Sequence, residues 1–233
     1  RIPAGGHLTL PIKAVRKNYQ GPIRLRAFGL PNEVSVAGGE IPPDADVALL
    51  TFSAGEAPAH GVLQVEGAAG ESVRRAVELS GDAGGLPPHL VSDIGWAVVK
   101  SNPLPLSWNL PAKRAVAAGE RIEATITVGD RGQEKRVVRL RLLTNQTPLK
   151  KKVKDDKGKE QEVDDVERML RLEKEFEIAA DASTAMIAIV VPKDLPPHLW
   201  DVVLVGELLS PDKKQVLATG YASLSQLDMT AAP

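Results

Sequence analysis

The chain has 233 residues, of which 43% are hydrophobic and 25% are charged, a composition typical of a folded globular protein. Its formal net charge of −1 excludes a general nucleic-acid binder, because such a protein needs a basic excess to displace the counterions of the phosphates. Because the chain has no cysteine, it cannot contain disulfides, thiolate metal sites or cysteine nucleophiles. No apolar run reaches the roughly 20 residues that cross a bilayer.

Proline and glycine divide the chain into short runs rich in Val, Ile, Leu and Thr, and many runs alternate apolar and polar side chains. This alternation is typical of a strand with one buried face. In chain order, the predicted strands cover residues 8–14, 23–28, 47–53, 62–66, 73–79, 122–128, 138–142, 186–191, 202–209 and 215–221. Pro11 predicts an edge strand, because proline cannot donate to a ladder. The predicted fold class is all-β.

The chain contains an internal repeat. Residues 41–50 align without gaps with residues 178–187, and an apolar strand follows in each copy. Upstream, Ala4-Gly5-Gly6 precedes one strand as Ala117-Ala118-Gly119 precedes another. Two copies of one strand order predict two tandem Ig-like antiparallel β-sandwiches joined by a short Gly/Pro linker.

The composition predicts where these domains begin and end. We expect a first sandwich over residues 1–80, a linker over 81–93 and a second sandwich over 94–233. By the repeat alignment, the first copy lacks a strand that residues 105–108 supply in the second. Either that strand precedes Arg1 in a longer protein or another element covers the open edge. We expect Arg1 to be a point at which the longer protein has been cut.

Several segments resemble one family of bacterial proteins. Residues 15–25, followed by 29–31, and residues 141–146, 191–196 and 207–219 are similar to recurring segments of large secreted bacterial proteins. Those proteins carry tandem Ig-like sandwiches beside bacterial pre-peptidase C-terminal (PPC) domains. The resemblance implies an Ig-like fold and an exported, multidomain parent at the cell surface or outside the cell, with the periplasm also open. It supplies no catalytic residue.

The sequence offers no signature of catalysis. It has no Gly-x-Ser-x-Gly elbow and no phosphate loop followed by Lys and Ser or Thr. The histidines are isolated from one another, at His7, His60, His89 and His198. An enzyme would need distant residues such as His89, Asp93 and His198 to meet in one cleft. We therefore expect no enzyme activity and no catalytic, cofactor-binding or metal-binding residue.

Two features suggest a surface for a partner. A charged insertion near residues 149–168, present only in the second copy, is predicted to form either a two-stranded ribbon or a short helix. Its Lys150, Lys151 and Lys152 would favour an anionic partner, although nearby carboxylates oppose their charge. Trp108 lies between two polar residues and is a second candidate for exposure.

These observations predict a non-catalytic structural or interaction module that spaces, presents or attaches neighbouring domains of one polypeptide. A partner protein or glycan at a surface is also expected. The alternative is a carbohydrate- or peptide-binding module. A glycan would need exposed tryptophans, whereas Trp96 and Trp200 each precede apolar runs typical of a core. A peptide would add to a strand edge near residues 8–14.

Overall fold

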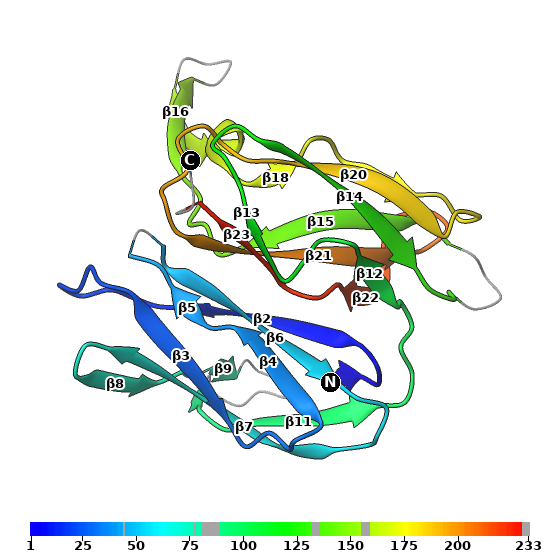
Figure 1. The fold of residues 1–233 in the computed structure, drawn as a ribbon, viewed down its shortest axis with the longest axis horizontal. Helices are drawn as coiled ribbons and strands as arrows, with labels where there is room; N and C mark the ends of the chain where they lie inside the picture. Colours follow the sequence, from blue (N-terminus) through cyan, green and yellow to red (C-terminus); the bar gives the residue numbers. More distant parts are fainter. Residues whose placement is uncertain (44, 77, 81–88, 132–135, 155–158, 230–233) are drawn as a thin grey trace. The chain divides into compact units, whose positions relative to one another are not determined.

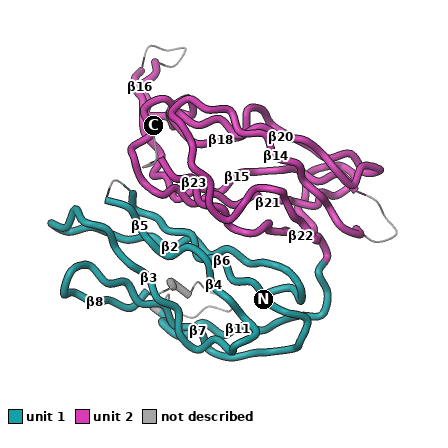
Figure 2. The backbone as a smooth tube through the Cα atoms, viewed as in Figure 1, with its two compact units in different colours: residues 1–102 teal, residues 103–233 magenta. Residues whose placement is uncertain are grey.

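The computed structural model describes residues 1–43, 45–76, 78–80, 89–131, 136–154 and 159–229 (Figure 1). The backbone divides into two compact units, residues 1–102 and residues 103–233 (Figure 2). Apart from one 3-10 turn, η1 (Val166–Arg168), the regular elements of the described residues are strands. The prediction of an all-β chain with two tandem Ig-like sandwiches is confirmed. The described residues contain no helix long and apolar enough to span a membrane.

Unit 1 is a sandwich of two sheets. Its strands are β1 (Ile2–Pro3), β2 (His7–Lys13), β3 (Ile23–Phe28), β4 (Val34–Gly38), β5 (Glu40–Ile41), β6 (Val47–Ala54), β7 (His60–Ala69), β8 (Ser72–Arg75), β9 (Glu78–Ser80), β10 (His89–Val91) and β11 (Ile94–Val99). One sheet has the order β2-β6-β4, and the other has the order β1-β11-β7-β3-β5 with β8 also paired to β7. Strands β9 and β10 form a separate antiparallel pair.

The core of unit 1 lies between these sheets because alternate residues of each strand face inward. Apolar side chains from β6, β7 and β11 form one buried cluster, which includes Leu50, Phe52, Leu63, Val65, Trp96 and Val98. Partly buried side chains of β2 and β3 pack against this cluster. The unit therefore has a hydrophobic core of its own.

Unit 2 is built in the same way. Its strands are β12 (Leu106–Trp108), β13 (Lys113–Ala115), β14 (Arg121–Val128), β15 (Val138–Thr144), β16 (Lys150–Lys154), β17 (Glu160–Asp164), β18 (Arg171–Leu172), β19 (Phe176–Ile178), β20 (Thr184–Val190), β21 (Leu199–Leu209), β22 (Val216–Tyr221) and β23 (Ser225–Asp228). One sheet has the order β12-β14-β20-β18, and the other has the order β13-β23-β21-β15-β19 with β22 paired to β21. Strands β16 and β17 form the charged ribbon.

The repeat in the sequence corresponds to a duplicated strand order. Strands β1, β11, β7, β3 and β5 of unit 1 occupy the same relative positions as β13, β23, β21, β15 and β19 of unit 2. The pairs also agree residue by residue, since Ile23 faces Ile41 in one unit and Val138 faces Ile178 in the other. Each unit also pairs its last strand in parallel with a strand near its start, β1 with β11 in unit 1 and β13 with β23 in unit 2.

A matching turn connects β1 with β2 in unit 1 and β13 with β14 in unit 2. Leu8 faces Phe52 and Ile122 faces Ile189, so Leu8 and Ile122 are counterparts. Gly5 and Gly119, each three residues earlier, have φ of +62° and +77°. This left-handed conformation favours glycine. The sequence alignment, which set Gly6 against Gly119, was therefore wrong by one residue.

The predicted domain boundary was also wrong. Residues 94–99 were assigned to the second sandwich, but they form β11, which pairs with β7 and β1 inside unit 1. Residues 89–91 of the predicted linker form β10, and residues 81–88 lie outside the described part of the chain. Glycine and proline are common both in linkers and in turns within a domain, so composition placed the boundary too early. The units divide between Asn102 and Pro103.

Candidate functional site

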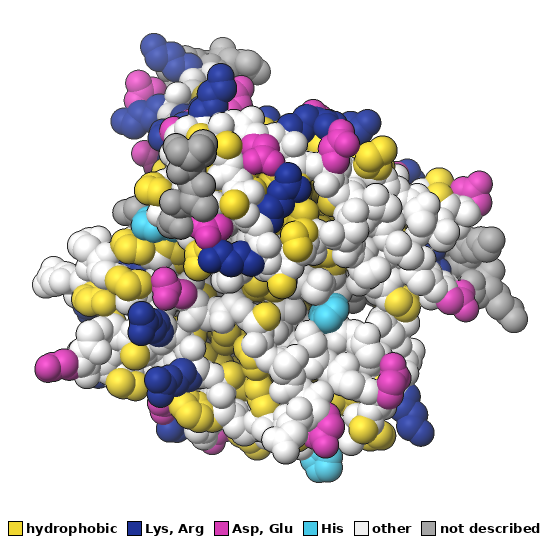
Figure 3. Space-filling view, viewed as in Figure 1, with side chains coloured by type: hydrophobic (Ala, Val, Ile, Leu, Met, Phe, Trp, Pro, Cys, Tyr) yellow, Lys and Arg dark blue, Asp and Glu magenta, His cyan; other side chains and the backbone are white. Residues whose placement is uncertain are grey.

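The charged insertion forms the predicted ribbon, and its lysines are exposed on β16. Each lysine forms an ion pair with a carboxylate of the same insertion. The ion pairs are Lys150 with Asp164, Lys151 with Asp165 at 3.1 Å and Lys152 with Glu160 at 3.7 Å. Figure 3 shows basic and acidic side chains intermixed on this part of the surface. An anionic partner would have to compete with these carboxylates, although such exposed pairs are individually weak. The ribbon stays a predicted partner surface.

Trp108 is buried, so its prediction as a surface residue was wrong. Only 8% of Trp108 is exposed, and its indole N–H donates to the carbonyl of Ser223 at 3.0 Å. The cause is the alternation of β12, which turns Leu106 and Trp108 inward and Ser107 outward. Trp96 and Trp200 are 8% and 1% exposed. The structure therefore presents no exposed tryptophan on which a sugar ring could stack.

Two of the three candidate acid–base residues, Asp93 and His198, have local partners, and so does the isolated His7. The side chain of the third candidate, His89, lies outside the described part of the structure. His7 Nδ1 lies 2.7 Å from Ser53 Oγ, and burial lowers the pKa of His7. Asp93 Oδ1 accepts a bond from Gln64 Nε2 at 2.6 Å. The His198 ring meets the Trp200 ring edge-on, with centroids 5.9 Å apart. The described residues contain no group of three or more His, Asp or Glu side chains that could hold a metal ion.

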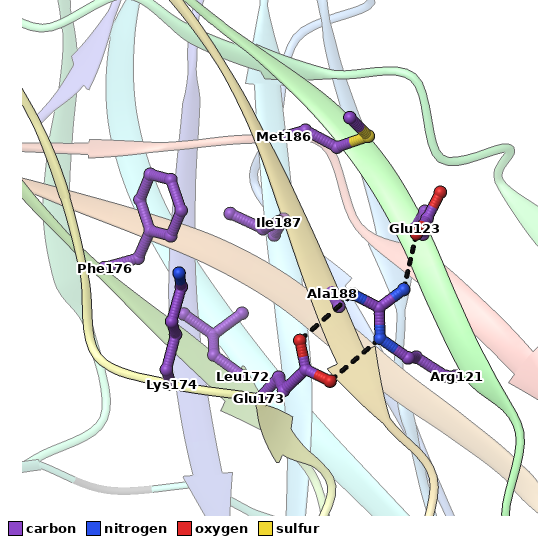
Figure 4. Close-up of a pocket in the computed structure, with 9 residues that line it drawn as sticks. All are labelled: Arg121, Glu123, Leu172, Glu173, Lys174, Phe176, Met186, Ile187 and Ala188. Atoms are coloured by element: carbon purple, nitrogen blue, oxygen red, sulfur yellow. Dashed lines mark hydrogen bonds and ion pairs between the residues drawn. The ribbon is translucent and has the colours of Figure 1, made fainter.

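A small hollow of about 180 Å³ lies on unit 2 around Arg121 (Figure 4). The guanidinium of Arg121 binds both carboxylate oxygens of Glu173, at 2.8 and 3.0 Å, and it also pairs with Glu123. This contact lowers the pKa of Glu173 and raises that of Arg121. Arg121 is therefore already bound by two carboxylates. Lys174 also lines the hollow, and its ammonium lies over the Phe176 ring, 5.8 Å from the ring centroid.

A larger open groove lies between the two sheets of unit 1. It has a volume of about 470 Å³. Its apolar lining comes from β2, β3 and β5, and Gly67 of β7 also lines it; these residues include Ile12, Ile23, Leu25 and Ile41. Such a concave, mainly apolar site is the usual form of a binding site.

The rim of this groove is basic. Lys13, Arg16, Lys17, Arg74 and Arg75 line it, and no Asp or Glu is among the described residues that do so. The guanidinium of Arg16 donates to the carbonyls of nearby loops, and Arg75 pairs with a glutamate at 3.6 Å. Lys13, Lys17 and Arg74 have no ion pair with another described residue. The groove thus combines an apolar floor with free positive charge at its edge.

The matching space in unit 2 is filled by the chain itself. Leu25 faces Gly67 and Leu140 faces Gly206, so the two glycines are counterparts. A Cβ on Gly206 would lie 3.3 Å from both Leu104 Cδ2 and Leu106 Cδ2. These leucines are 1% and 6% exposed. Residues 104–106 therefore fill, in unit 2, the space that is open in unit 1.

Sequence reasoning noticed the missing strand but did not find the groove. The described residues of unit 1 contain no counterpart of β12, and β2 pairs only with β6. The prediction that Pro11 lies in an edge strand is confirmed. The groove itself depends on residues far apart in sequence, from Ile12 to Ala76, so only the missing strand could have signalled it.

Comparisons with known proteins give only distant relations. No family model matches the chain, and no curated protein matches it either. Among solved structures, a marsupial T cell receptor is similar over 98% of this chain and 70% of its own, with 9% sequence identity and a TM-score of 0.28. No functional statement rests on so distant a match. The bacterial family suggested by the sequence stays a prediction.

Proposed function

We propose that the chain is a non-catalytic structural and interaction module of a larger exported bacterial protein, in which it spaces, presents or attaches neighbouring domains. The observation that carries this proposal is the duplicated strand order of units 1 and 2 on one continuous chain. Repeating a sandwich with its own core lengthens a polypeptide without requiring a new fold. Fold alone does not identify a ligand, so any specific role depends on edges and loops.

The chemistry of the surface supports a structural role. Lys150, Lys151 and Lys152 of the ribbon and Arg121 of the hollow are each engaged with a carboxylate. Asp93, one of the candidate acid–base residues, and the isolated His7 each bond to a neutral polar side chain. Catalytic sites instead place ionisable groups together and shift their pKa values.

We further propose that the parent protein is exported to the cell surface or the medium, or to the periplasm, and that it carries PPC domains. The resemblance of residues 15–25 and 207–219 to secreted bacterial repeats supports this location. The partners would then be neighbouring domains of the same polypeptide, with a surface protein or glycan as a further possibility.

Two measurements test the proposal. Sequencing the coding region on both sides of the segment should show an export signal and neighbouring domains, and a frame that encodes a cytoplasmic enzyme instead would contradict it. Force spectroscopy on the chain should give two separate unfolding events, because each unit has its own ladders. A single cooperative event would contradict independent units in a spacer.

Of the two alternative functions, the structure favours the peptide-binding module. A glycan module is not supported, because all three tryptophans are buried. A peptide module is supported by the outer edge of β2, which no described strand covers. Titration with an extended peptide would distinguish this alternative from a purely structural role.

A further inference from the structure

The ribbon of β16 and β17 has two open edges. Figure 2 shows that β16 extends away from the sandwich of unit 2. The two strands pair with each other and with no other strand of the described residues. All five residues of β16 are exposed, and so are four of the five residues of β17. The outer edge of each strand is therefore accessible to a further strand.

A buried glutamine holds the base of the ribbon. Gln146, which is 7% exposed, lies before the ribbon, and Arg168 and Leu170 lie after it. The side-chain amide of Gln146 donates to Arg168 O and accepts from Leu170 N, both at 2.8 Å. Arg168 also forms an ion pair with Asp194. Because both ends of the insertion are fixed, a partner that binds the ribbon has few residues to order, which lowers the entropic cost of binding.

The backbone of β16 directs alternate N–H and C=O groups to its outer edge. Asp165 N donates to Leu149 O at 2.8 Å, so these two residues form a hydrogen-bonded pair within the ribbon. In an antiparallel ladder, such pairs alternate with pairs whose N–H and C=O groups point outward. Lys150 comes next along the ladder, and Lys152 and Lys154 follow in the same phase. These three lysines therefore offer outward backbone groups to an added strand.

The same three lysines form a row of positive charge. Their side chains lie on one face of the ribbon, because alternate residues of a strand share a face. Lys150 and Lys152 form ion pairs with carboxylates of β17, whereas Lys154 has no ion pair with another described residue. On the outer side of β16, no strand of the described residues brings a carboxylate to this row. A strand added there would meet three lysines at alternate positions.

The ion pairs within the ribbon do not exclude an acidic strand on its outer edge. A lysine ammonium has three donors, so it can bond to carboxylates on both neighbouring strands. Arg121 of the same unit shows such sharing, since it binds Glu173 at 2.8 and 3.0 Å and also pairs with Glu123. A lysine of β16 can thus serve β17 and an added strand together.

We propose that the outer edge of β16 is a docking surface for an extended strand of a partner protein that carries acidic side chains at alternate positions. Each acidic residue lies directly opposite a lysine, and opposite charges in a cross-strand pair are favourable. The lysines also disfavour uncharged and basic strands, which makes the edge selective. The edge of β16 is favoured over that of β17, because four residues of β16 are lysine and three residues of β17 are acidic. This inference specifies the partner's chemistry and rests on the proposed interaction role.

Peptide titration tests the charge pattern of the partner strand. The probe is a fluorescent peptide with the sequence of residues 160–164, Glu-Gln-Glu-Val-Asp, added to the full chain at low ionic strength and followed by anisotropy. Half-saturation at about 1 mM or below is expected. A control peptide of the same composition, Glu-Glu-Asp-Gln-Val, should bind at least about threefold more weakly, because its charges do not alternate. Equal binding of the two peptides would indicate a general site for polyanions and would overturn the proposal, as would no binding up to about 10 mM.

Amide hydrogen exchange, followed by NMR, locates the bound strand. In the free chain, the outward N–H groups of Lys150, Lys152 and Lys154 should exchange faster than the N–H of Lys151, which faces β17. A near-saturating concentration of the probe peptide should slow the three outward groups by at least about threefold and leave Lys151 unchanged. Unchanged exchange at the three outward groups would overturn the proposal. Altered exchange at Lys151 would overturn it too, because the peptide would then displace β17.

Substitutions of Lys152 separate backbone pairing from charge. K152Q removes the ammonium and keeps the outward N–H, whereas K152P also removes this N–H and leaves the inward bonds of the ribbon in place. K152Q should weaken binding of the probe peptide by about two- to fivefold, and K152P by more. The control K151Q removes a charge from the opposite face and should have a smaller effect than K152Q. Equal affinities of K152Q and K152P would exclude backbone pairing, and equal affinities of K151Q and K152Q would show that only net charge matters; either result would overturn the proposal.

Failure of this inference can be distinguished from failure of the proposed function. The export signal and the two unfolding events test the spacer role without any peptide. A chain that shows both of these but does not bind the probe peptide would keep its structural role and lose the docking surface on β16.

Discussion

The two units share one strand order but differ at one edge of the described residues, and this difference shows how the cover of an edge changes the space between two sheets. In unit 2, β12 covers the edge of β14, and Leu104 and Leu106 fill the space between the sheets. In unit 1 the same edge and the same space are open. A groove between the sheets is thus open where the described residues contain no counterpart of β12.

A second difference concerns the position of the large side chain in a matching cross-strand pair. In unit 1, Trp96 on β11 faces Gly61 on β7. In unit 2, Leu227 on β23 faces Trp200 on β21. Each pair holds one indole, carried by a different strand.

The largest effect is expected from a substitution that breaks the cross-strand pair of Trp200 and Leu227 in unit 2. Replacing Trp200 by alanine should lower the free energy of unfolding of unit 2 by about 3–5 kcal/mol, because a fully buried aromatic side chain is removed. Urea denaturation followed by circular dichroism measures this loss. V166A in the same unit is the control, since Val166 is 53% exposed and should change stability by less than about 0.5 kcal/mol. A loss below about 1 kcal/mol for W200A would contradict the packing role.

The next prediction concerns a substitution that opens, in unit 2, part of the space that is open in unit 1. L104A empties part of the space against Gly206 and should destabilise unit 2 by about 2–5 kcal/mol. The same urea titration measures it. V15A, which changes an 83% exposed residue beside the open groove, should have little effect. If both variants unfold at the same denaturant concentration as the natural chain, the leucine does not support the sandwich.

A smaller effect concerns pH. Burial lowers the pKa of His7 in the folded state below its ordinary value of 6.5, so the unfolded chain binds the proton more tightly. The stability of unit 1 should therefore fall as the pH drops through about 6.5 toward the folded pKa. Thermal unfolding of H7Q between pH 8 and pH 5 should show a weaker pH dependence than the natural chain. An identical pH dependence would exclude this contribution.

The smallest effect is expected at the exposed Arg121–Glu173 pair. Because Arg121 lowers the pKa of Glu173, the stabilising contribution exists above the ordinary pKa of 4.5 and is lost as the pH falls through the folded value. E173Q should slightly lower the unfolding temperature at pH 7 and have no effect at about pH 2. A double-mutant cycle with R121Q measures the pair, and additivity at pH 7 would mean that it contributes nothing.

The strands with clear alternation were predictable. The range 23–28 predicted from sequence is that of β3, and β14 begins one residue before its predicted range. The two-residue strands β1 and β5 were missed, because partners distant in sequence decide whether so short a segment is a strand. The apolar residues of β11 were recognised but assigned to the wrong domain, because the partner strands β1 and β7 are distant in sequence.

The site was less predictable than the fold. Exposure of Trp108 was inferred from its polar neighbours, but neighbours in a strand point to the opposite face, so Ser107 and Asn109 describe the wrong side. The lysines of β16 were identified correctly as exposed. Which carboxylate pairs with each lysine could not be predicted, because it depends on the register of the ribbon. The groove needed three-dimensional information, because it joins two sheets.

The parallel contact between β1 and β11 has a consequence for biosynthesis. Ile2 faces Val98 and Pro3 faces Val99, so the first residues of unit 1 have no ladder partner until almost one hundred residues have been synthesised. Until then, β1 cannot form its backbone hydrogen bonds with β11. Closure of this sheet therefore has to follow the synthesis of β11, and the sandwich of unit 1 stays open at this edge while the chain is being made.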